Sequence, residues 1–402
     1  MKIVLITTTQ PSANPRLVKE ADAFCTAGYD VTVLYCYVAD WAQMADKAVL
    51  KNVKWNYIQI GGVKKRSLIY QWTRLKYGIH KKINETFGEN IVSEKAHARC
   101  YIELLSAAVK LKADYYIGHN PGAMAIAANA AKLNQANAGF DFEDYHRGEY
   151  SDAMSADAKR QVVLECKYVS RFNYISAASK MIVQKIQKDF PNLSVAIITL
   201  LNCFPLSDRE PFRNKRNDSL RLLWFSQHIG KGRGLESVIT GLKILNDPQI
   251  HITLVGNCTE DIKNLLVKLA GDMSKNIQFA GTIAPGELVR FASSFDIGLA
   301  TELQKPLNRD ICLTNKIFTY LLSGNALILS DTLMQKDFNQ EYRVGESYAV
   351  NNSDEFMTAV LKFKDRELLD EQRMNNYNLA ASTFHWEKES IKLLNRISSL
   401  NN

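Results

Sequence analysis

The chain has 402 residues, 46% of them hydrophobic and 23% charged, which predicts two globular domains and excludes a disordered, collagen-like or low-complexity protein. Fifty Lys and Arg residues against 42 Asp and Glu residues leave a formal net charge of +8. A modest basic excess of this kind suits nucleic acid, an anionic membrane surface or a phosphate-bearing substrate, and does not distinguish among them.

The start of the chain predicts a buried strand and not a signal peptide, because the apolar run at 2–6 is short and polar residues follow it. No stretch of the sequence approaches the roughly 18 apolar residues that span a bilayer. The seven cysteines are scattered and include no Cys-x-x-Cys pair. We therefore expect neither a disulfide framework nor a zinc site, and a reducing cytoplasm fits. No ligand-spaced histidine cluster appears, so no protein-held metal is expected.

The first half begins with a strand at 2–6, a polar loop at 7–14, a helix at 15–27 and a strand at 31–35. Pro15 suits the first position of the helix, where no N–H is needed. A strand, helix and strand of this length predict two parallel strands joined by a right-handed crossover. The same reasoning predicts further strands at 114–118 and 195–200 and helices at 122–133 and 181–190.

The second half repeats this order after residues 205–219, which are rich in Pro, Asn, Asp, Arg and Lys and are interpreted as a linker. Strands are predicted at 220–225, 251–255, 277–279, 296–300 and 326–330, helices at 235–245, 285–292 and 315–323, and helical structure from 354 to the end. The expected fold class is α/β, with two doubly wound, Rossmann-like domains facing across a cleft and ligands beyond the carboxyl ends of the strands.

The loop at 226–234 (SQHIGKGRG) joins a predicted strand to a predicted helix. Its three glycines allow backbone N–H groups to approach a ligand, and Lys231 and Arg233 add positive charge near a helix N-terminus. This pattern favours a diphosphate, although a tight turn with a solvated basic pair is the alternative. The loop matches neither the dinucleotide fingerprint nor the P-loop. A second loop, 307–316, places Lys316 at another helix start, where simple helix capping is the alternative.

These pieces, taken in order, resemble retaining glycosyltransferases of the GT-B fold, specifically glycosyltransferase family 4. The matching pieces are 28–33 (GYDVTV), 114–120 (DYYIGHN), 141–144 (DFED), Asn202, 223–226 (LWFS), 233–236 (RGLE), 253–256 (TLVG), 277–281 (IQFAG), 295–299 (FDIGL), 315–324 (NKIFTYLLSG) and 384–387 (FHWE). The resemblance implies an acceptor-binding domain at 1–205, on which 386–402 packs back, and a nucleotide-sugar-binding domain at 206–385.

By this resemblance the donor diphosphate contacts Gly230, Lys231, Gly232, Arg233 and Lys316, and the nucleotide or sugar contacts Gly256, Glu302, Asn315 and Thr319. Arg233 takes the place of the family's loop lysine. The family's earlier arginine is missing, and Lys231 is the available substitute. The family's two glutamates would fall at Ile311 and Thr319, and neither is acidic; Glu302 or Asp310 is a candidate replacement. Because of these departures, a catalytically inactive subunit stands as an alternative.

On the acceptor side the resemblance places His119 and Asp144 as catalytic candidates, with Asn14, Arg16 and Glu149 lining the site. A structural histidine, and a capping and salt-bridge cluster around 141–149, are the alternatives. Retention through a single front-face attack needs no protein nucleophile, and none is assigned.

The positive charge is concentrated at 64–82, which holds seven Lys or Arg residues, no Asp or Glu, and interleaved apolar and aromatic residues. A basic, aromatic, partly helical segment favours an anionic membrane surface. A solvated face or a nucleic-acid patch is the alternative, but no nucleic-acid motif accompanies it.

The sequence therefore predicts a cytoplasmic, metal-independent glycosyltransferase without a cofactor, which could be peripheral at the inner face of the membrane. It would move a hexose-type sugar from a UDP- or GDP-sugar to a glycan or lipid-linked acceptor in surface polysaccharide or glycoconjugate biosynthesis. The alternatives are a nucleotide-sugar epimerase of the same fold and a catalytically inactive sugar-nucleotide-binding or scaffold subunit. Donor, acceptor, linkage and oligomeric state are left open.

Overall fold

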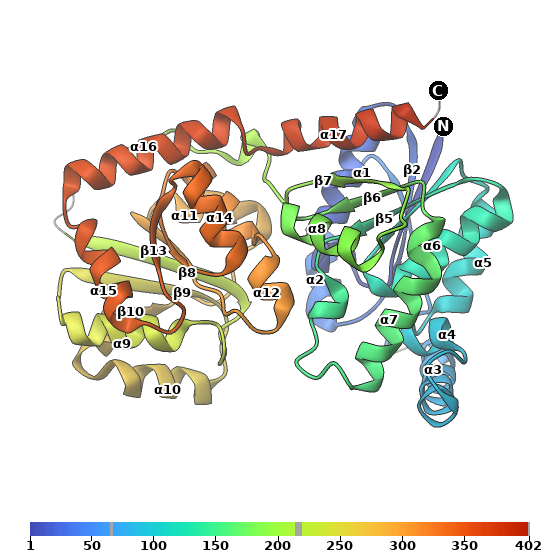
Figure 1. Cartoon of the computed structure of the whole chain (residues 1–402), viewed down its shortest axis with the longest axis horizontal. Helices are drawn as coiled ribbons and strands as arrows, with labels where there is room; N and C mark the ends of the chain where they lie inside the picture. Colours follow the sequence, from blue (N-terminus) through green and yellow to red (C-terminus); the bar gives the residue numbers. More distant parts are fainter. Residues whose placement is uncertain (65–66, 214–218, 401–402) are drawn as a thin grey trace. The chain divides into compact units, whose positions relative to one another are not determined.

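The computed structural model describes residues 1–64, 67–213 and 219–400. The chain divides into two compact units (Figure 1). The first comprises Met1–Leu200 together with the C-terminal segment from Ser390, and the second comprises Leu201–Glu389. The division therefore falls between Leu200 and Leu201, whereas the sequence placed it at 205/206. Of the predicted linker, residues 214–218 lie outside the described residues, and Leu206–Asp208 form a short 3-10 helix, η4.

The first unit contains one parallel sheet in the order β3-β2-β1-β4-β5-β6-β7. The strands are β1 (Lys2–Thr7), β2 (Asp30–Cys36), β3 (Asn56–Ile60), β4 (Tyr115–His119), β5 (Asn137–Phe142), β6 (Tyr174–Ala177) and β7 (Ala196–Thr199). Ile3 of the central strand pairs with Val31 on one side and Tyr115 on the other. Its neighbours Val4, Leu5 and Ile6 are fully buried, as expected for a parallel strand covered on both faces.

Helices of the first unit connect these strands. They are α1 (Pro15–Thr26), α2 (Asp40–Val49), α3 (Leu68–Phe87), α4 (Ser93–His97), α5 (Tyr101–Leu111), α6 (Pro121–Asn134), α7 (Ala156–Tyr168) and α8 (Lys180–Asp189), with 3-10 turns η1 (Pro11–Ala13), η2 (His146–Gly148) and η3 (Val169–Arg171). Helices α5 and α6 pack beside each other against the sheet, and α7 packs on α6 (Figure 1). The alanines of α6 are largely buried, and their small side chains allow this helix to lie close to β4 and β5.

The second unit contains a parallel sheet in the order β10-β9-β8-β11-β12-β13. The strands are β8 (Leu220–His228), β9 (Ile250–Asn257), β10 (Ile277–Phe279), β11 (Ile297–Ala300), β12 (Ala326–Ser330) and β13 (Gly345–Tyr348). Strand β8 extends three residues into the predicted glycine loop, and its register against β9 shifts between Phe225 and His228. A bulge there bends the end of the strand toward the loop.

Helices of the second unit lie on both sides of its sheet (Figure 1). They are α9 (Leu235–Leu245), α10 (Glu260–Ala270), α11 (Leu288–Ala292), α12 (Leu307–Ile311), α13 (Asn315–Ser323), α14 (Leu333–Tyr342), α15 (Ser353–Lys362) and α16 (Arg366–Ser382), with 3-10 turns η5 (Gly271–Asn276) and η6 (Pro285–Glu287). Helix α9 packs on α10 and α15, and α13 packs on α11 and α16.

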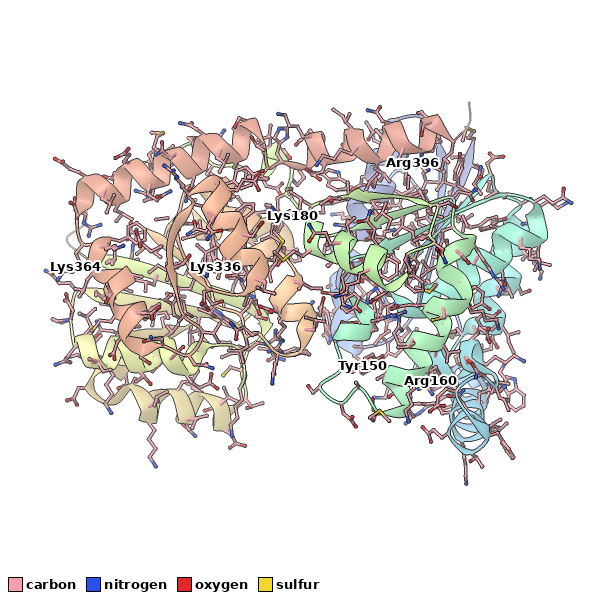
Figure 2. The ribbon with its side chains drawn as sticks, viewed as in Figure 1. Tyr150, Arg160, Lys180, Lys336, Lys364 and Arg396 are labelled. Carbon is pink, nitrogen blue, oxygen red and sulfur yellow. The ribbon has the colours of Figure 1, made fainter. Side chains whose placement is uncertain are left out.

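The last helix, α17 (Trp386–Ser399), begins in the second unit and belongs to the first from Ser390 onward. Leu393 and Ile397 are fully buried. Arg396, labelled in Figure 2, donates from Nη2 to the carbonyl oxygen of Asn173 at 2.9 Å. No helix in the part of the chain that the structure describes is long and apolar enough to cross a membrane.

The predicted fold class is confirmed, with two parallel α/β sheets that are each covered by helices. Two predicted elements differ from the observed ones in type or length. The helix predicted at 285–292 is a 3-10 turn, η6, followed by the one-turn helix α11. The strand at 195–200 is shorter, Ala196–Thr199, and lies at the edge of the sheet next to β6.

Candidate functional site

The carboxyl ends of the parallel strands mark the candidate site in each unit, because loops and helix N-termini gather there in doubly wound folds. In the first unit this edge carries His119 at the end of β4 and the residues that follow β5. In the second unit it carries the glycine loop after β8 and the residues that follow β11 and β12.

A buried ion pair of Arg16 and Asp141 forms the centre of the first group. Arg16 Nε and Nη2 donate to Asp141 Oδ2 and Oδ1 at 2.5 and 2.7 Å, and Nη1 donates to the carbonyl oxygen of Leu200 at 2.6 Å. Ser176 Oγ donates to Asp141 Oδ1 at 2.6 Å. Burial alone would raise the pKa of the Asp141 carboxyl, but Arg16 outweighs burial and lowers it. Asp141 is therefore an ionised carboxylate with a fixed orientation.

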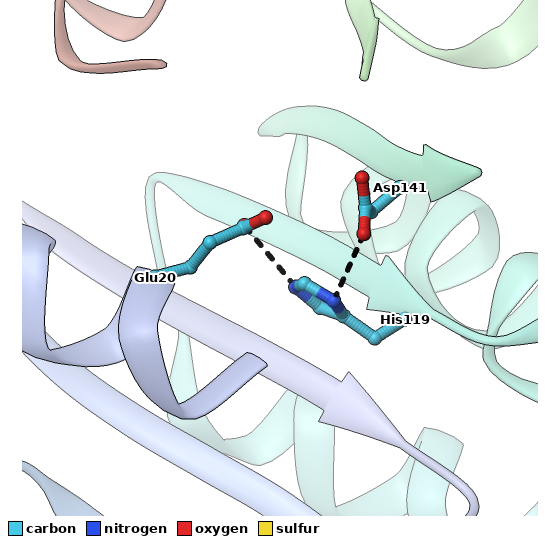
Figure 3. Close-up of side chains that lie close together, drawn as sticks. All are labelled: Glu20, His119 and Asp141. Atoms are coloured by element: carbon cyan, nitrogen blue, oxygen red, sulfur yellow. Dashed lines mark ion pairs between the residues drawn. The ribbon is translucent and has the colours of Figure 1, made fainter. Parts of the chain in front are cut away.

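His119 lies between two carboxylates, Glu20 and Asp141 (Figure 3). Its Nε2 is 3.3 Å from Glu20 Oε2, and its Nδ1 is 3.6 Å from Asp141 Oδ2. All three side chains are fully buried. Burial alone would lower the pKa of His119, but Glu20 and then Asp141 outweigh it and raise the pKa. Arg16 and His119 therefore place two basic groups against two carboxyl groups in the same buried cluster.

The same three residues are the one set of potential metal ligands that the described part of the chain brings together, with one atom from each within 4.8 Å of the others. Tetrahedral ligands of a zinc ion lie closer, roughly 3.4 Å apart. Moreover, the two ring nitrogens of His119 face different carboxylates, and Arg16 already binds both oxygens of Asp141. The arrangement fits a buried ion network better than a metal centre.

Two acceptor-side predictions require correction. Arg16 was expected to line the acceptor, but it is 1% exposed and its guanidinium is bound to Asp141 and Leu200. Asn14 is also buried, and its side-chain oxygen caps α1 by accepting from the N–H of Leu17 at 3.1 Å. Neither residue presents a surface that an acceptor could contact. Arg16 instead orients Asp141, and Asn14 caps α1, so both hold the structure beneath the site. His119, with no exposed surface, occupies the same inner layer.

The residues after β5 are the more accessible part of this edge. Glu143 and Asp144 are half-buried, and Glu149 is exposed. Burial, followed by the charges of Asp141 and Asp144, raises the pKa of Glu143 to about 7. Sequence reasoning missed Glu143 as a candidate, although it stands inside the quoted DFED piece; its unusual proton affinity arises from neighbours that only the fold assembles.

His146 and Glu149 form a pair, with Nδ1 3.0 Å from Glu149 Oε2. Burial alone would lower the pKa of His146, but the hydrogen bond to Glu149 outweighs it and raises the pKa to about 9. This places Glu149 at the outer end of a charged pair, where it remains available for the predicted acceptor-side role.

Asn120, next to His119, is a second residue that sequence reasoning did not select. It has φ +68° before the first turn of α6, its Nδ2 donates to Thr7 Oγ1 at 2.7 Å, and its Oδ1 accepts from Thr8 Oγ1 at 2.8 Å. These bonds connect the loop after β1 to the end of β4. A non-glycine residue with positive φ at a strand end is a common feature of functional sites.

The glycine loop of the second unit is held from below by specific contacts. Gly232 and Gly234 have positive φ, 69° and 75°. Thr301 Oγ1 accepts from Trp224 Nε1 and donates to the carbonyl oxygen of Arg233, both at 2.8 Å. These contacts fix the backbone of the loop at the end of β8. Lys231 is exposed and Arg233 is half-buried.

Two side chains already contact the loop at Gly232. Glu236 Oε1 accepts from the Gly232 N–H at 3.3 Å, and Arg309 Nη1 donates to the Gly232 carbonyl oxygen at 2.5 Å. Arg309 brings a third positive charge next to Lys231 and Arg233, and sequence reasoning did not select it. The loop is therefore a fixed, cationic turn at the carboxyl edge of the sheet.

Lys316 and Glu302 form a buried pair beside this loop. Lys316 Nζ donates to Glu302 Oε1 at 2.6 Å and lies 5.6 Å from the centre of the Trp224 ring. The backbone N–H of Glu302 is fixed by Ser330 Oγ at 2.8 Å. A buried lysine with a single carboxylate partner at a strand-end edge has the chemistry to exchange that partner for a ligand phosphate.

Of the remaining residues predicted to contact the donor, one is exposed and two are buried. Asn315 is exposed at the first residue of α13. Thr319 is fully buried and donates to the carbonyl oxygen of Asn315 at 3.2 Å, so its placement does not favour the predicted contact with the nucleotide or sugar. Gly256 is buried, and a Cβ there would lie 2.5 Å from the carbonyl oxygen of Ser226, so its role is a close approach between β9 and the end of β8.

The fold, with a candidate site at the carboxyl ends of the strands in each unit, can be compared with known proteins. No protein-family model matches the sequence, and no curated protein matches it significantly. Solved structures do match over nearly the full length. HepE of Anabaena, in complex with UDP and glucose, has a TM-score of 0.70 at 15% identity and covers 99% of this chain and 100% of its own.

Two further solved structures match over nearly the full length. Sucrose-phosphate synthase of Thermosynechococcus elongatus has a TM-score of 0.70 at 11% identity, covering 100% of this chain and 99% of its own. TarM of S. aureus, whose mutant was solved in complex with UDP, has a TM-score of 0.69 at 10% identity, covering 98% and 99%. The chain has the GT-B fold of these glycosyltransferases, as the sequence predicted. Membership of family 4 and retention of configuration stay predictions.

Proposed function

We propose that this protein is a glycosyltransferase that takes a hexose-type sugar from a UDP- or GDP-sugar and transfers it to a glycan or lipid-linked acceptor. The observation that carries the proposal is the pairing of Lys316 with Glu302 beside a fixed cationic glycine loop, at the carboxyl edge of a sheet in a GT-B fold. The matched structures with bound UDP support this choice of ligand class.

The proposed chemistry depends on charge that develops when the sugar leaves the nucleoside diphosphate. Lys231, Arg233 and Lys316 supply positive charge for the β-phosphate without a metal ion or cofactor. Arg309, which already holds the Gly232 carbonyl, adds to the same field. When Lys316 turns toward the phosphate, Glu302 loses its cation and becomes free to accept hydrogen bonds from hydroxyl groups of the donor. We assign it the role of the carboxylates absent at Ile311 and Thr319.

On the acceptor side, the first domain would bind the hydroxyl that attacks the sugar. Glu143, Asp144 and Glu149 are the accessible carboxylates of that edge, and His119 acts from beneath as a positioning residue for Asp141 and Glu20. Front-face attack with retention requires no protein nucleophile, and none is proposed. A cytoplasmic location and a role in surface polysaccharide or glycoconjugate synthesis belong to the same proposal.

A binding subunit without transferase activity is the second candidate, because the family glutamates are absent and Thr319 is buried. This candidate predicts that the nucleotide sugar binds and is never consumed. If the protein is instead a transferase, we expect slow hydrolysis of the donor even when no acceptor is present.

The test is a thermal-shift screen of the full chain against UDP, GDP and ADP, each with and without its sugar, followed by donor hydrolysis. Lys316→Met and the pair Lys231→Ala and Arg233→Ala should weaken nucleotide binding by about 10- to 100-fold, since each removes a charged hydrogen bond to phosphate. Lys364→Ala is the matched control, because Lys364 is exposed and pairs with Asp247 at the opposite edge of the sheet (Figure 2).

Nucleotide binding that is equal in the parent and in Lys316→Met would contradict the assignment of the site. Binding without any hydrolysis or transfer would favour the non-catalytic subunit.

A further inference from the structure

Helix α3 has its apolar side facing solvent and its polar side facing the protein. Leu68, Trp72, Leu75 and Ile79 are 90%, 59%, 57% and 51% exposed. Their spacing of four, three and four residues places them on one face of the helix. We call these four residues the apolar stripe of α3. Ile69, which is 59% exposed, lies beside the stripe.

The opposite face of α3 is attached to the domain by polar contacts. Thr73 and Asn84 are the buried residues of the helix. Thr73 Oγ1 accepts from Arg99 Nη1 at 2.6 Å, and Asn84 Oδ1 accepts from Nη1 of Arg160, a residue of α7 labelled in Figure 2, at 2.7 Å. Asn84 Nδ2 also donates to the carbonyl oxygen of Ile91 at 2.7 Å. The helix is thus held in place without using its apolar stripe.

The lysine and arginine side chains of α3 divide into two groups, and its one carboxylate, Glu85, is exposed. Lys76 pairs with Glu103 of α5, and Lys81 lies 3.2 Å from Asp157 of α7. These two lysines therefore anchor the helix to its neighbours. Arg74 and Lys82 are exposed on the outer side, and neither forms an ion pair with any residue that the structure describes. The predicted basic segment begins at Lys64; Lys65 and Arg66 lie outside the described residues.

We propose that α3 is an interfacial helix that lies in the plane of an anionic lipid bilayer, with the apolar stripe among the acyl chains and Arg74 and Lys82 at the headgroups. Charge complementarity selects this occupant, because the outer face combines apolar side chains with positive charge.

This inference rests on the proposed function and narrows its substrate class. A transferase held at a bilayer meets acceptors that are themselves embedded there, so the acceptor would be an amphiphile with a lipid anchor and a polar sugar-accepting end. Helix α3 also contacts the carboxyl edge of the sheet of the first unit. Tyr70 of α3 packs edge-on against Tyr37, one residue beyond the end of β2, with ring centres 5.7 Å apart.

The experiment is vesicle flotation of the full chain. The parent should float with phosphatidylcholine vesicles that contain about one third phosphatidylglycerol, and bind pure phosphatidylcholine at least about tenfold more weakly. The triple variant Leu68→Ser, Trp72→Ser, Leu75→Ser should lose binding by more than about tenfold, because three apolar side chains no longer leave water. Arg74→Gln and Lys82→Gln should each weaken binding by about fivefold.

The matched control is the triple variant Ile244→Ser, Leu333→Ser, Leu361→Ser, which removes three exposed apolar side chains from the second unit. It should float like the parent. Equal flotation of the α3 triple variant and the parent would overturn the proposal. So would a parent that forms a dimer in sedimentation equilibrium and becomes monomeric in the α3 variant, because the stripe would then be a contact between copies.

Insertion, as opposed to surface adsorption, is tested by quenching of tryptophan fluorescence with brominated lipids. The parent should be quenched, and Trp72→Phe should retain flotation while losing most of the quenching. Quenching that persists in Trp72→Phe would contradict insertion of the stripe. The nucleotide thermal shift should be unchanged in the α3 variants, so a failure of membrane binding is distinguished from a failure of the proposed transferase function.

Discussion

Arg16 and Asp141 illustrate how a charged pair can be buried at a tolerable energetic cost. Both oxygens of the carboxylate and three nitrogens of the guanidinium have partners, which compensates for the loss of water around each ion. His119 and Glu20 complete the network, with Glu20 Oε2 3.3 Å from His119 Nε2 and Oε1 3.9 Å from Arg16 Nε. The network explains why the histidine at the end of β4 is buried in this chain.

Asp141→Asn is expected to destabilise the protein by about 3–5 kcal/mol, because it leaves the Arg16 guanidinium buried without its counter-charge. Urea unfolding of the intact chain at neutral pH measures this free energy. Glu346→Gln is the control, since it removes one carboxylate charge from a surface pair with the half-exposed Lys362 and should cost less than about 1 kcal/mol. A loss below about 1 kcal/mol for Asp141→Asn would show that the network does not carry the predicted energy.

Glu143 makes the stability of the first unit depend on pH. Its folded pKa of about 7 lies above the ordinary value of 4.5. Between these values the folded state holds a proton that the unfolded state has released, so the contribution of Glu143 to stability falls as pH rises from about 4.5 to about 7. Above pH 7 the group is a charged carboxylate in an unfavourable position.

Glu143→Gln should therefore stabilise the protein by about 1–3 kcal/mol at pH 8 and have little effect at pH 5. The measurement is urea unfolding of parent and variant at both pH values. Glu260→Gln, at an exposed carboxylate on α10, controls for the loss of one negative charge. An equal effect of Glu143→Gln at both pH values would mean that Glu143 does not titrate in this range.

Close packing between β11 and α13 depends on a glycine. A Cβ at Gly298 would lie 2.1–2.4 Å from the ring carbons of Tyr320, whose hydroxyl donates to the carbonyl oxygen of Leu223 at 3.0 Å. Neither the buried ring nor the strand can move easily. The fit of a small residue on the strand to a large one on the helix thus fixes the distance between the two elements.

Gly298→Ala is expected to destabilise the protein by about 3 kcal/mol or more through overpacking. Gly78→Ala is the matched control in α3, where an added Cβ meets no atom within 4 Å. It should stabilise the protein by about 0.5–1 kcal/mol, because glycine in the middle of a helix is unfavourable. Thermal unfolding of both variants would test the pair, and a neutral Gly298→Ala would contradict the packing argument.

Helices and strands differed in how well the sequence predicted them. Apolar runs with turn residues at both ends, such as 277–279, 315–323 and 326–330, are observed with the predicted bounds. The glycine loop was predicted to begin at 226, but β8 continues to His228, because its last residues still pair with β9 through a bulge. Pairing with the neighbouring strand in the sheet, and not local propensity, decides whether those residues belong to the strand or to the loop.

For helix α3, the sequence did not indicate which face meets solvent. The sequence indicated a basic and aromatic segment that is partly helical, and a helix on the surface of a globular domain normally turns its apolar face toward the core. The fold places Thr73 and Asn84 inside instead, where the guanidinium groups of Arg99 and Arg160 reach them. Only these distant partners determine which face of the helix meets solvent.

The division of the chain into two units follows from its sequence order, but the assignment of its last helix does not. The repeated strand, loop and helix order in both halves predicts two doubly wound domains, and the two sheets confirm it. The segment from Ser390 belongs to the first unit because Leu393 and Ile397 are buried and Arg396 bonds to Asn173. The sequence expectation for this return came from resemblance to a family and not from local pattern.

By itself, the sequence determined the α/β class, the parallel sheets and the position of the glycine loop, because hydrophobic periodicity and turn residues are local signals. The tertiary structure decided which charged residues are buried together. Glu20, on α1, precedes His119, at the end of β4, by about a hundred residues, and Asp141 lies on the neighbouring strand β5. The pKa shifts of His119 and Asp141 exist only when the fold removes water and adds neighbours. For the same reason Arg16 and Asn14, predicted to contact an acceptor, instead support the site from within.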